Sequence, residues 1–266
     1  MRFKIIILSL IMVSFLSCNQ EDNQNSENDY IKGFVWNVDK FADVAVMRFQ
    51  VPGFEKLSLN QKILIYYLYQ ASLCGRDIIY DQNYKHNLLI RRTLEKIYQK
   101  YNGDRATDEW KNFVIYLKRV WFSNGIHHHY STEKFIPDFS QEYFRQLVSE
   151  LSDEDIELLD GESRQQFLSK MTAIIFDPGV DSKRVNLDPY VDIIASSANN
   201  FYEDLTLEEV EDFYNKQFDT ATNKNISFGL NSKLVKVNNV IEERIYKSDR
   251  LYGKAIEKII FWLEKA

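Results

Sequence analysis

The sequence predicts an α+β fold that is mainly α-helical and carries a small antiparallel β component. Two observations lead to this prediction. Apolar residues recur at helical spacing through most of residues 58–220, and the pattern changes to alternation around the Asn-Asn pair at 238–239. The 266 residues are 45% hydrophobic and 14% aromatic, which is enough material for a substantial packed core.

Helix starts are marked by two capping boxes. Ser58 with Gln61, and Thr206 with Glu209, have the spacing at which each side chain satisfies a free backbone N–H of the other residue. Helices are expected over residues 58–73, 88–101, 108–122, 140–151, 162–176, 206–218 and 251–263.

Strands are expected in two places. Alternating apolar residues over Ala42–Val51 predict a single strand. Short alternating segments at 232–237 and 240–246 flank Asn238 and Asn239, and asparagine tolerates the positive φ that a tight hairpin turn requires.

The N-terminal segment predicts export. Residues 1–17 combine a basic start with a short apolar run, as a secretory signal does, and the ending at Ser17-Cys18 resembles a bacterial lipobox. An ordinary signal peptide in which Cys18 has no role is the alternative. Residues 18–40 are largely polar and are expected to form a tether. The expected protein is therefore an exported bacterial lipoprotein of the cell envelope, anchored to the membrane through lipidated Cys18.

Charge and motif content exclude several function classes. The 33 Lys+Arg and 39 Asp+Glu residues give a formal net charge of −6, so the chain lacks the basic field of a nucleic-acid binder. No glycine-rich phosphate loop and no Gly-x-Ser-x-Gly nucleophile elbow is present. Cys74, the single cysteine of the body, is expected to be a buried structural residue.

Three consecutive histidines, His127 to His129, are the main candidate for site chemistry. Neighbouring residues on an extended chain point to opposite faces, so at most His127 and His129 share a metal ion, and no His-Glu-x-x-His motif exists. Two interpretations stay open. The loop lines a cleft where imidazoles and Tyr130 hydrogen-bond a ligand, or it only packs against the body. Arg91-Arg92 and Arg76-Asp77 are expected to form surface ion pairs.

Distinctive runs of residues follow one another in order from Phe41 to Ala266. They are 41–43, 51–54, 73–83, 90–95, 120–130, 134–137, 183–186, 228–232 and 252–258. Together these runs resemble the bacterial branch of the dipeptidyl-peptidase III family. The resemblance implies a zinc exopeptidase that releases dipeptides from the amino end of short peptides, with two lobes around a wide cleft.

The resemblance covers only part of such an enzyme. The family's zinc-binding motifs, His-Glu-x-x-x-His and a later Glu-Glu helix, belong to the second lobe and do not occur in this sequence. Residues 41–266 are therefore expected to be the N-terminal portion of the non-zinc lobe, truncated at the C-terminus. The chain is expected to have no catalytic residue, to bind no zinc, to be inactive alone, and to have the missing zinc lobe as a partner.

The resemblance also implies which residues bind substrate. Tyr130 lies at a position where the family has an aromatic residue facing the cleft, and Asn124 and His129 are its neighbours. Two further hypotheses remain beside the peptidase fragment. The chain is a membrane-tethered, non-catalytic peptide-binding lipoprotein, or it is a degenerate product with no stable function.

Overall fold

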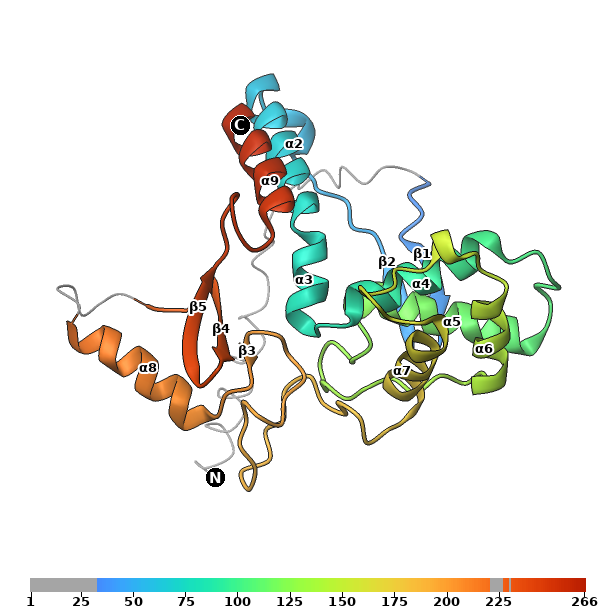
Figure 1. The fold of residues 1–266 in the computed structure, drawn as a ribbon. Coiled ribbons are helices and arrows are strands. Elements are labelled where there is room, and N and C mark those ends of the chain that lie inside the picture. The colour runs from blue at the N-terminus through green and yellow to red at the C-terminus, as the bar shows by residue number, and fades with distance from the viewer. Residues whose placement is uncertain (1–32, 221–226, 230) are drawn as a thin grey trace, which may run out of the picture. The chain divides into compact units, whose positions relative to one another are not determined.

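The computed structural model describes residues 33–220, 227–229 and 231–266 (Figure 1). The predicted signal segment, Cys18 and most of the predicted tether lie outside these residues. The described chain is mainly helical with a small β component, so the predicted fold class is confirmed.

The described residues form two compact units. The first contains residues 33–40 and 45–56, and the second contains 41–44 and the described residues from Leu57 onward. Strands β1 (Asn37–Phe41) and β2 (Val44–Met47) pair as a hairpin, and a 3-10 turn, η1 (Phe54–Lys56), follows them.

The hairpin corrects one prediction. The single strand expected over Ala42–Val51 is wrong, because Ala42 adopts φ 46° and lies in the turn that separates β1 from β2. Strand β1 also begins within the range expected to be a tether. Val35, Trp36 and Val38 give this end of the range the apolar and β-branched character of a strand.

Helices α2 to α7 precede the second sheet. They are α2 (Leu59–Cys74), α3 (Arg76–Asn83), α4 (Asn87–Lys100), α5 (Asp108–Ser123), α6 (Gln141–Ser149) and α7 (Arg164–Phe176), with a 3-10 turn η2 (Asp153–Asp155) before α7. The Ser58–Gln61 capping box opens α2 as predicted. Thr107 and Ser140 cap α5 and α6 through their hydroxyl groups. The short helix α3 has no counterpart among the predictions.

The main core lies among α3, α4, α5, α6 and α7. Its fully buried large side chains include Tyr80, Ile90, Phe113, Phe144 and Phe167. Burial of this apolar surface is the main favourable term in folding. The core therefore fixes the ends of α3, α4 and α5, from which the candidate site is built.

The second sheet has the order β3-β4-β5. Strand β3 (Tyr202–Glu203) is parallel to β4 (Ser232–Val237), and β4 is antiparallel to β5 (Val240–Ile245). The predicted hairpin is confirmed, because Asn238 and Asn239 have φ of 49° and 63° between the paired ends of β4 and β5.

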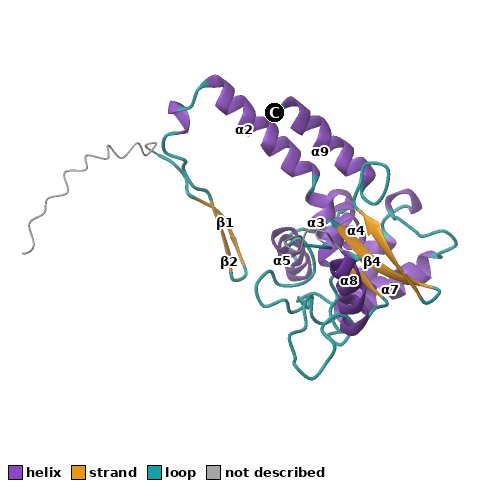
Figure 2. Ribbon diagram, turned by 90° about the vertical axis from the view of Figure 1, so that its left-hand side faces the viewer, coloured by secondary structure: helices purple, strands orange, loops and turns teal. Residues whose placement is uncertain are grey.

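Two helices accompany this sheet. Helix α8 (Leu207–Thr220) follows β3, and the predicted Thr206–Glu209 capping box is present. Helix α9 (Gly253–Lys265) lies beside α2, as both views show (Figure 2), with the rings of Tyr67 and Trp262 stacked at a centroid distance of 6.0 Å.

A buried polar network connects the sheet with α3 and α9. The Lys233 ammonium on β4 donates to Asn200 Oδ1 and Glu203 Oε2, both at 2.5 Å. Asp81 Oδ2 on α3 accepts from Asn200 Nδ2 at 3.1 Å and from the Tyr252 hydroxyl at 2.5 Å. The hydrogen bond from Lys233 lowers the pKa of Glu203, so this carboxylate is charged at neutral pH.

We expect Lys233→Met to lower the free energy of unfolding by about 3 kcal/mol, because it leaves Asn200 and Glu203 without their buried cation. Lys236→Met is the matched control on the same strand. Lys236 pairs with Glu209, but both side chains are about 30% exposed, so its loss should cost no more than about 1 kcal/mol. Urea unfolding at pH 7 measures both values. Equal losses would contradict the structural role of the buried network.

Candidate functional site

The loop that carries the predicted substrate-binding residues starts at the end of α5. Asn124 adopts φ 52° and ends the helix, and its backbone N–H donates to Val120 O. Gly125 follows with φ 146°, a conformation that residues with a Cβ rarely adopt. These two residues turn the chain away from the helix axis, so residues 126–130 run back across the core.

The side-chain amide of Asn87, at the first turn of α4, holds this turn in place. Asn87 is fully buried, and its Nδ2 donates to Tyr80 O at 3.1 Å and to Asn124 O at 3.4 Å. Its Oδ1 accepts from Ile126 N at 3.1 Å. One side chain thus joins backbone groups of α3, of the α5 terminus and of the loop. Tyr80 O also accepts from Tyr84 N, and Asn124 O also accepts from Asn83 Nδ2.

The position of the Asn87 side chain also requires a glycine at residue 125. A Cβ at this position would lie 2.0 Å from Asn87 Nδ2, closer than real Cβ atoms approach any neighbour. The loop therefore depends on a glycine at 125 for its φ and for its contact with Asn87.

The three consecutive histidines have different environments. His127 is 2% exposed, its Nε2 lies 2.7 Å from Asp181 O, and its Nδ1 has no hydrogen-bond partner. Burial lowers the His127 pKa to about 4, so the ring is neutral at pH 7. His128 and His129 are half-buried. A metal ion shared by His127 and His129 therefore has no support, because one ring is enclosed and the other is at the surface.

At the tip of the loop, the rings of three consecutive residues lie against one another. The His128 and His129 rings stack with centroids 4.5 Å apart, and the Tyr130 ring lies 4.2 Å from that of His129. His128 Nδ1 accepts from the backbone N–H groups of Tyr130 and Ser131, which fixes the backbone beneath the tyrosine. Tyr130 itself is 84% exposed. The start of the loop packs against the core and its tip faces outward, and ligand binding by the tip stays a prediction.

Arg184 and Asn83 bring the predicted residues Asn124 and His129 together. Arg184 Nη1 donates to Asn83 Oδ1 at 3.1 Å, and its Nη2 donates to His129 O at 3.3 Å. Asn83 Nδ2 donates to Asn124 O at 3.1 Å. Both side chains donate hydrogen bonds to the loop backbone, and each is 41 or more residues from its acceptor in sequence. A local sequence motif does not reveal contacts over such separations. Their one sequence signal is that they lie in runs 73–83 and 183–186.

Lys134 anchors the segment that returns from the loop tip. Its ammonium donates to three backbone carbonyls at the end of α7, Ile174 O, Asp177 O and Val180 O. A cation at a helix C-terminus is favoured by the helix dipole and by the free carbonyls there. Lys134 also forms a β-bridge with His127, so the C-terminus of α7 supports the underside of the loop.

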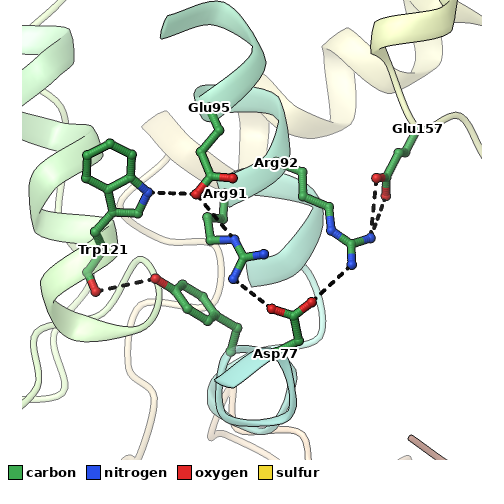
Figure 3. Close-up of polar contacts among 7 residues, drawn as sticks. Asp77, Arg91, Arg92, Glu95, Trp121 and Glu157 are labelled. Atoms are coloured by element: carbon green, nitrogen blue, oxygen red, sulfur yellow. Dashed lines mark hydrogen bonds and ion pairs between the residues drawn. The ribbon is translucent and has the colours of Figure 1, made fainter. Parts of the chain in front are cut away.

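The arginine pair predicted to make ion pairs does so through Asp77 (Figure 3). Arg91 Nη1 and Arg92 Nη2 contact the two carboxylate oxygens of Asp77 at 2.9 and 3.3 Å. Glu95 Oε1 accepts from Trp121 Nε1 at 2.9 Å and lies 3.6 Å from Arg91 Nε. The Arg91 side chain is 14% exposed, whereas Asp77, Arg92 and Glu157 are 41–55% exposed, so most of this network lies at the surface as predicted.

Cys74 differs from its prediction. It is half-buried and lines a surface cavity of about 420 Å³ together with Asp77, Lys254 and Lys258. The prediction of full burial is wrong, because α2 is covered on one side by α9 and its last turn stays accessible.

A second cavity, of about 400 Å³, lies beside β3 and the start of α8. Its lining includes Lys85, Asp181, Asp204 and Lys236. The three predicted substrate-binding residues do not line either this cavity or the one at Cys74. Tyr130 lies at the exposed tip of the loop, whereas Asn124 is half-buried at its start.

Metal and membrane features were sought among the described residues. Within 33–220, 227–229 and 231–266, no three His, Cys, Asp or Glu side chains are grouped so that they could hold a metal ion. In the same part of the chain, none of the helices has the length and hydropathy needed to cross a bilayer.

Comparison with known proteins gives no family assignment. No model of a protein family matches the chain, and no curated protein matches it. What the loop does must therefore be argued from its own residues and contacts.

We expect Gly125→Ala to destabilise the protein by about 3 kcal/mol or more, since it must displace the Asn87 side chain and adopt an unfavourable φ. Gly161→Ala is the control, because Gly161 also has positive φ (77°) but has no atom within 4 Å of an added Cβ. This control should lose only about 1 kcal/mol. Urea unfolding compares the two, and similar losses would show that the Asn87 contact is unimportant.

Acid should weaken the fold through His127. The pKa of His127 is below its ordinary value in the folded state. The contribution of the neutral ring to the free energy of unfolding is therefore complete above pH 6.5 and is lost as the pH falls towards 4. The shift corresponds to a loss of up to about 3 kcal/mol. Unfolding free energies at pH 7 and pH 4.5 measure it, and His127→Gln, which keeps a donor for Asp181 O, should fall less over this interval. A parallel pH dependence in the two proteins would contradict the assignment.

Proposed function

We propose that this chain is the N-terminal part of the non-zinc lobe of a dipeptidyl-peptidase III-like exopeptidase. In this proposal the complete enzyme releases dipeptides from the amino end of short peptides, and its zinc and catalytic residues come from the partner zinc lobe. The present chain supplies a peptide-binding wall and has no catalytic residue of its own.

The observation that carries this proposal is the way the resembling runs meet one another. Asn83, His129 and Arg184 belong to three different runs, and hydrogen bonds join both Asn83 and Arg184 to the backbone of the loop that carries His129. The ion network of Figure 3 likewise joins Asp77, Arg91 and Trp121 from three runs. Runs that are distant in sequence but touch in space are expected when a resemblance reflects one shared structure rather than chance matches.

The chemistry of the loop tip suits a peptide. An exposed tyrosine ring offers apolar area and a hydroxyl group at low entropic cost, and the neighbouring imidazole of His129 adds a hydrogen-bonding group. The backbone under both residues is held by His128 and Arg184, so little ordering is required on binding. We assign Tyr130 as the main contact with a bound peptide, and His129 and Asn124 as its neighbours.

The proposed location is the cell envelope of a bacterium. Lipidated Cys18 would anchor the protein to the membrane, and the polar residues after it would act as a tether. Both features lie outside the described residues, and the proposal rests on the sequence of the first 32 residues.

A second candidate function is a non-catalytic lipoprotein that captures peptides at the membrane. It is favoured by one feature of the structure: side chains of this chain, among them Asn83, Asn87 and Arg184, hold the loop in place.

Peptide titration tests the shared part of both proposals. We expect short peptides of four to six residues to bind the chain with a Kd in the micromolar range, and Tyr130→Ala to weaken binding by at least about tenfold. Tyr190→Ala is the matched control, since Tyr190 is 94% exposed in a different loop. Absence of binding, or equal effects of the two substitutions, would remove the proposed role of the loop.

Hydrolysis of a dipeptidyl arylamide separates the two candidates. The peptidase proposal expects no turnover by this chain alone and chelator-sensitive turnover once the zinc lobe is supplied. The capture proposal expects peptide binding and no turnover in either case. Chelator-sensitive turnover by residues 1–266 alone would contradict both.

A further inference from the structure

The cavity of about 400 Å³ beside β3 and the start of α8 has the size of pockets that hold small organic molecules. Segments that are distant in sequence form its walls: residues 84–85 after α3, residues 194–200, and residues 202–209, which run from β3 into α8. Asp181 and Lys236 complete the lining. The peptide contact proposed for the loop tip does not involve this cavity.

Two acidic side chains of the lining already have lysine partners. The Lys236 ammonium contacts Glu209 Oε1, and the Lys233 ammonium lies 2.5 Å from Glu203 Oε2. These hydrogen bonds lower the pKa of each glutamate, so both carboxylates are charged at neutral pH. Because each carboxylate has a cation beside it, these groups add little net charge to the cavity.

Three further charged residues of the lining have no ion-pair partner in the part of the chain that the structure describes. Lys85 and Asp204 are exposed, and neither side chain makes a hydrogen bond or ion pair with a described residue. Asp181 Oδ2 accepts from the hydroxyl of Tyr84, a neutral group whose pKa is raised by burial. The cavity therefore has one ammonium group and two carboxylates without a counter-ion.

The charge of Lys85 lies near the buried ion pair. The hydrogen bond from Lys233 has the largest effect on the pKa of Glu203, and the nearby Lys85 ammonium lowers that pKa further. Two ammonium groups thus surround a single carboxylate at this part of the cavity. Such an excess of positive charge is suited to an anionic group of a ligand, whereas Asp181 and Asp204 are suited to cationic groups.

The lining also includes apolar and aromatic side chains. Ile194, Ala195 and Leu205, of which Leu205 is 4% exposed, offer surface for methylene groups. Tyr84 and Tyr202 add aromatic rings, on which a guanidinium group can stack. A short hydrocarbon chain that ends in a cation matches this combination.

We propose that this cavity binds a free basic amino acid of the arginine or lysine type. Lys85 contacts the α-carboxylate, and Asp181 and Asp204 receive the α-ammonium group and the side-chain cation. A neutral amino acid would leave one of the two carboxylates without a partner, and an amine that has no carboxylate would face the Lys85 ammonium. This inference does not depend on the proposed peptidase role.

Isothermal titration calorimetry of the full chain with four ligands tests the proposal, with Cys18→Ser in every sample so that no lipid is attached. We expect L-arginine to bind with a Kd of about 100 µM to 1 mM. L-Citrulline has nearly the same shape without the side-chain charge, agmatine lacks the carboxylate, and Nα-acetyl-L-arginine lacks the α-ammonium group. Each of the three should bind at least about tenfold more weakly, because one charge of the cavity stays unpaired.

Two substitutions assign the binding to this cavity. Lys85→Met and Asp204→Asn should each raise the Kd of L-arginine about tenfold. Both should fold, because these side chains are exposed and asparagine tolerates the positive φ of residue 204, which is 56°. Lys85→Met should not weaken agmatine, an outcome that a general loss of structure would not produce. Lys247→Met and Asp160→Asn, at exposed residues outside the cavity, are the matched controls and should leave the Kd unchanged.

Several results would overturn the proposal. They are absence of heat with about 5 mM L-arginine, equal binding of L-citrulline, and equal effects of the cavity substitutions and their controls. Agmatine that binds as tightly as L-arginine would also overturn it, and would assign the cavity to amines. Equal binding of Nα-acetyl-L-arginine would overturn the free amino acid as the ligand, and would assign the cavity to the C-terminal residue of a peptide.

Discussion

The side-chain amide of Asn87 is the contact on which the candidate site depends. It is fully buried and joins three backbone groups, Tyr80 O, Asn124 O and Ile126 N, that come from α3, from the end of α5 and from the loop. Each group alone would be costly to bury without a partner. One amide satisfies them together, and its position leaves room only for glycine at residue 125.

The other contacts of the site lie successively further from the Asn87 side chain. His127 and Lys134 hold the underside of the loop against Asp181 and the end of α7. Arg184 then fixes the outer backbone at His129, and only beyond it does the exposed Tyr130 ring appear. A supported backbone with one exposed aromatic side chain is a suitable arrangement for binding a flexible ligand, because few bonds of the protein must be ordered on binding.

Local sequence signals predicted most helices and the second hairpin. The two capping boxes and the pair Asn238-Asn239 act on neighbours within a few residues, so their effects can be read from the sequence. Helix α3 was missed because only Gly75 separates it from α2, and that glycine adopts an ordinary helical φ of −81°. Strand β3 has two residues and exists through its pairing with β4, which no local pattern encodes.

The sequence predicted less of the candidate site than of the helices and the second hairpin. The sequence indicated which loop carries exposed polar and aromatic groups, since three histidines and a tyrosine follow an Asn-Gly pair. It did not indicate that His127 is enclosed while His129 is at the surface, nor that Asn83 and Arg184 join across 101 residues. Such contacts are set by tertiary packing, which overrides local preference.

The network around Asp81 has a consequence for the order of folding. The hydrogen bond between Asp81 and Tyr252 joins residues that are 171 positions apart in sequence. The bond between Asp81 and Asn200 joins residues that are 119 positions apart. During synthesis, Asp81 and Asn200 are available long before Tyr252 emerges. Tyr252, at the start of α9, is therefore the last of these three residues to become available for the network during synthesis.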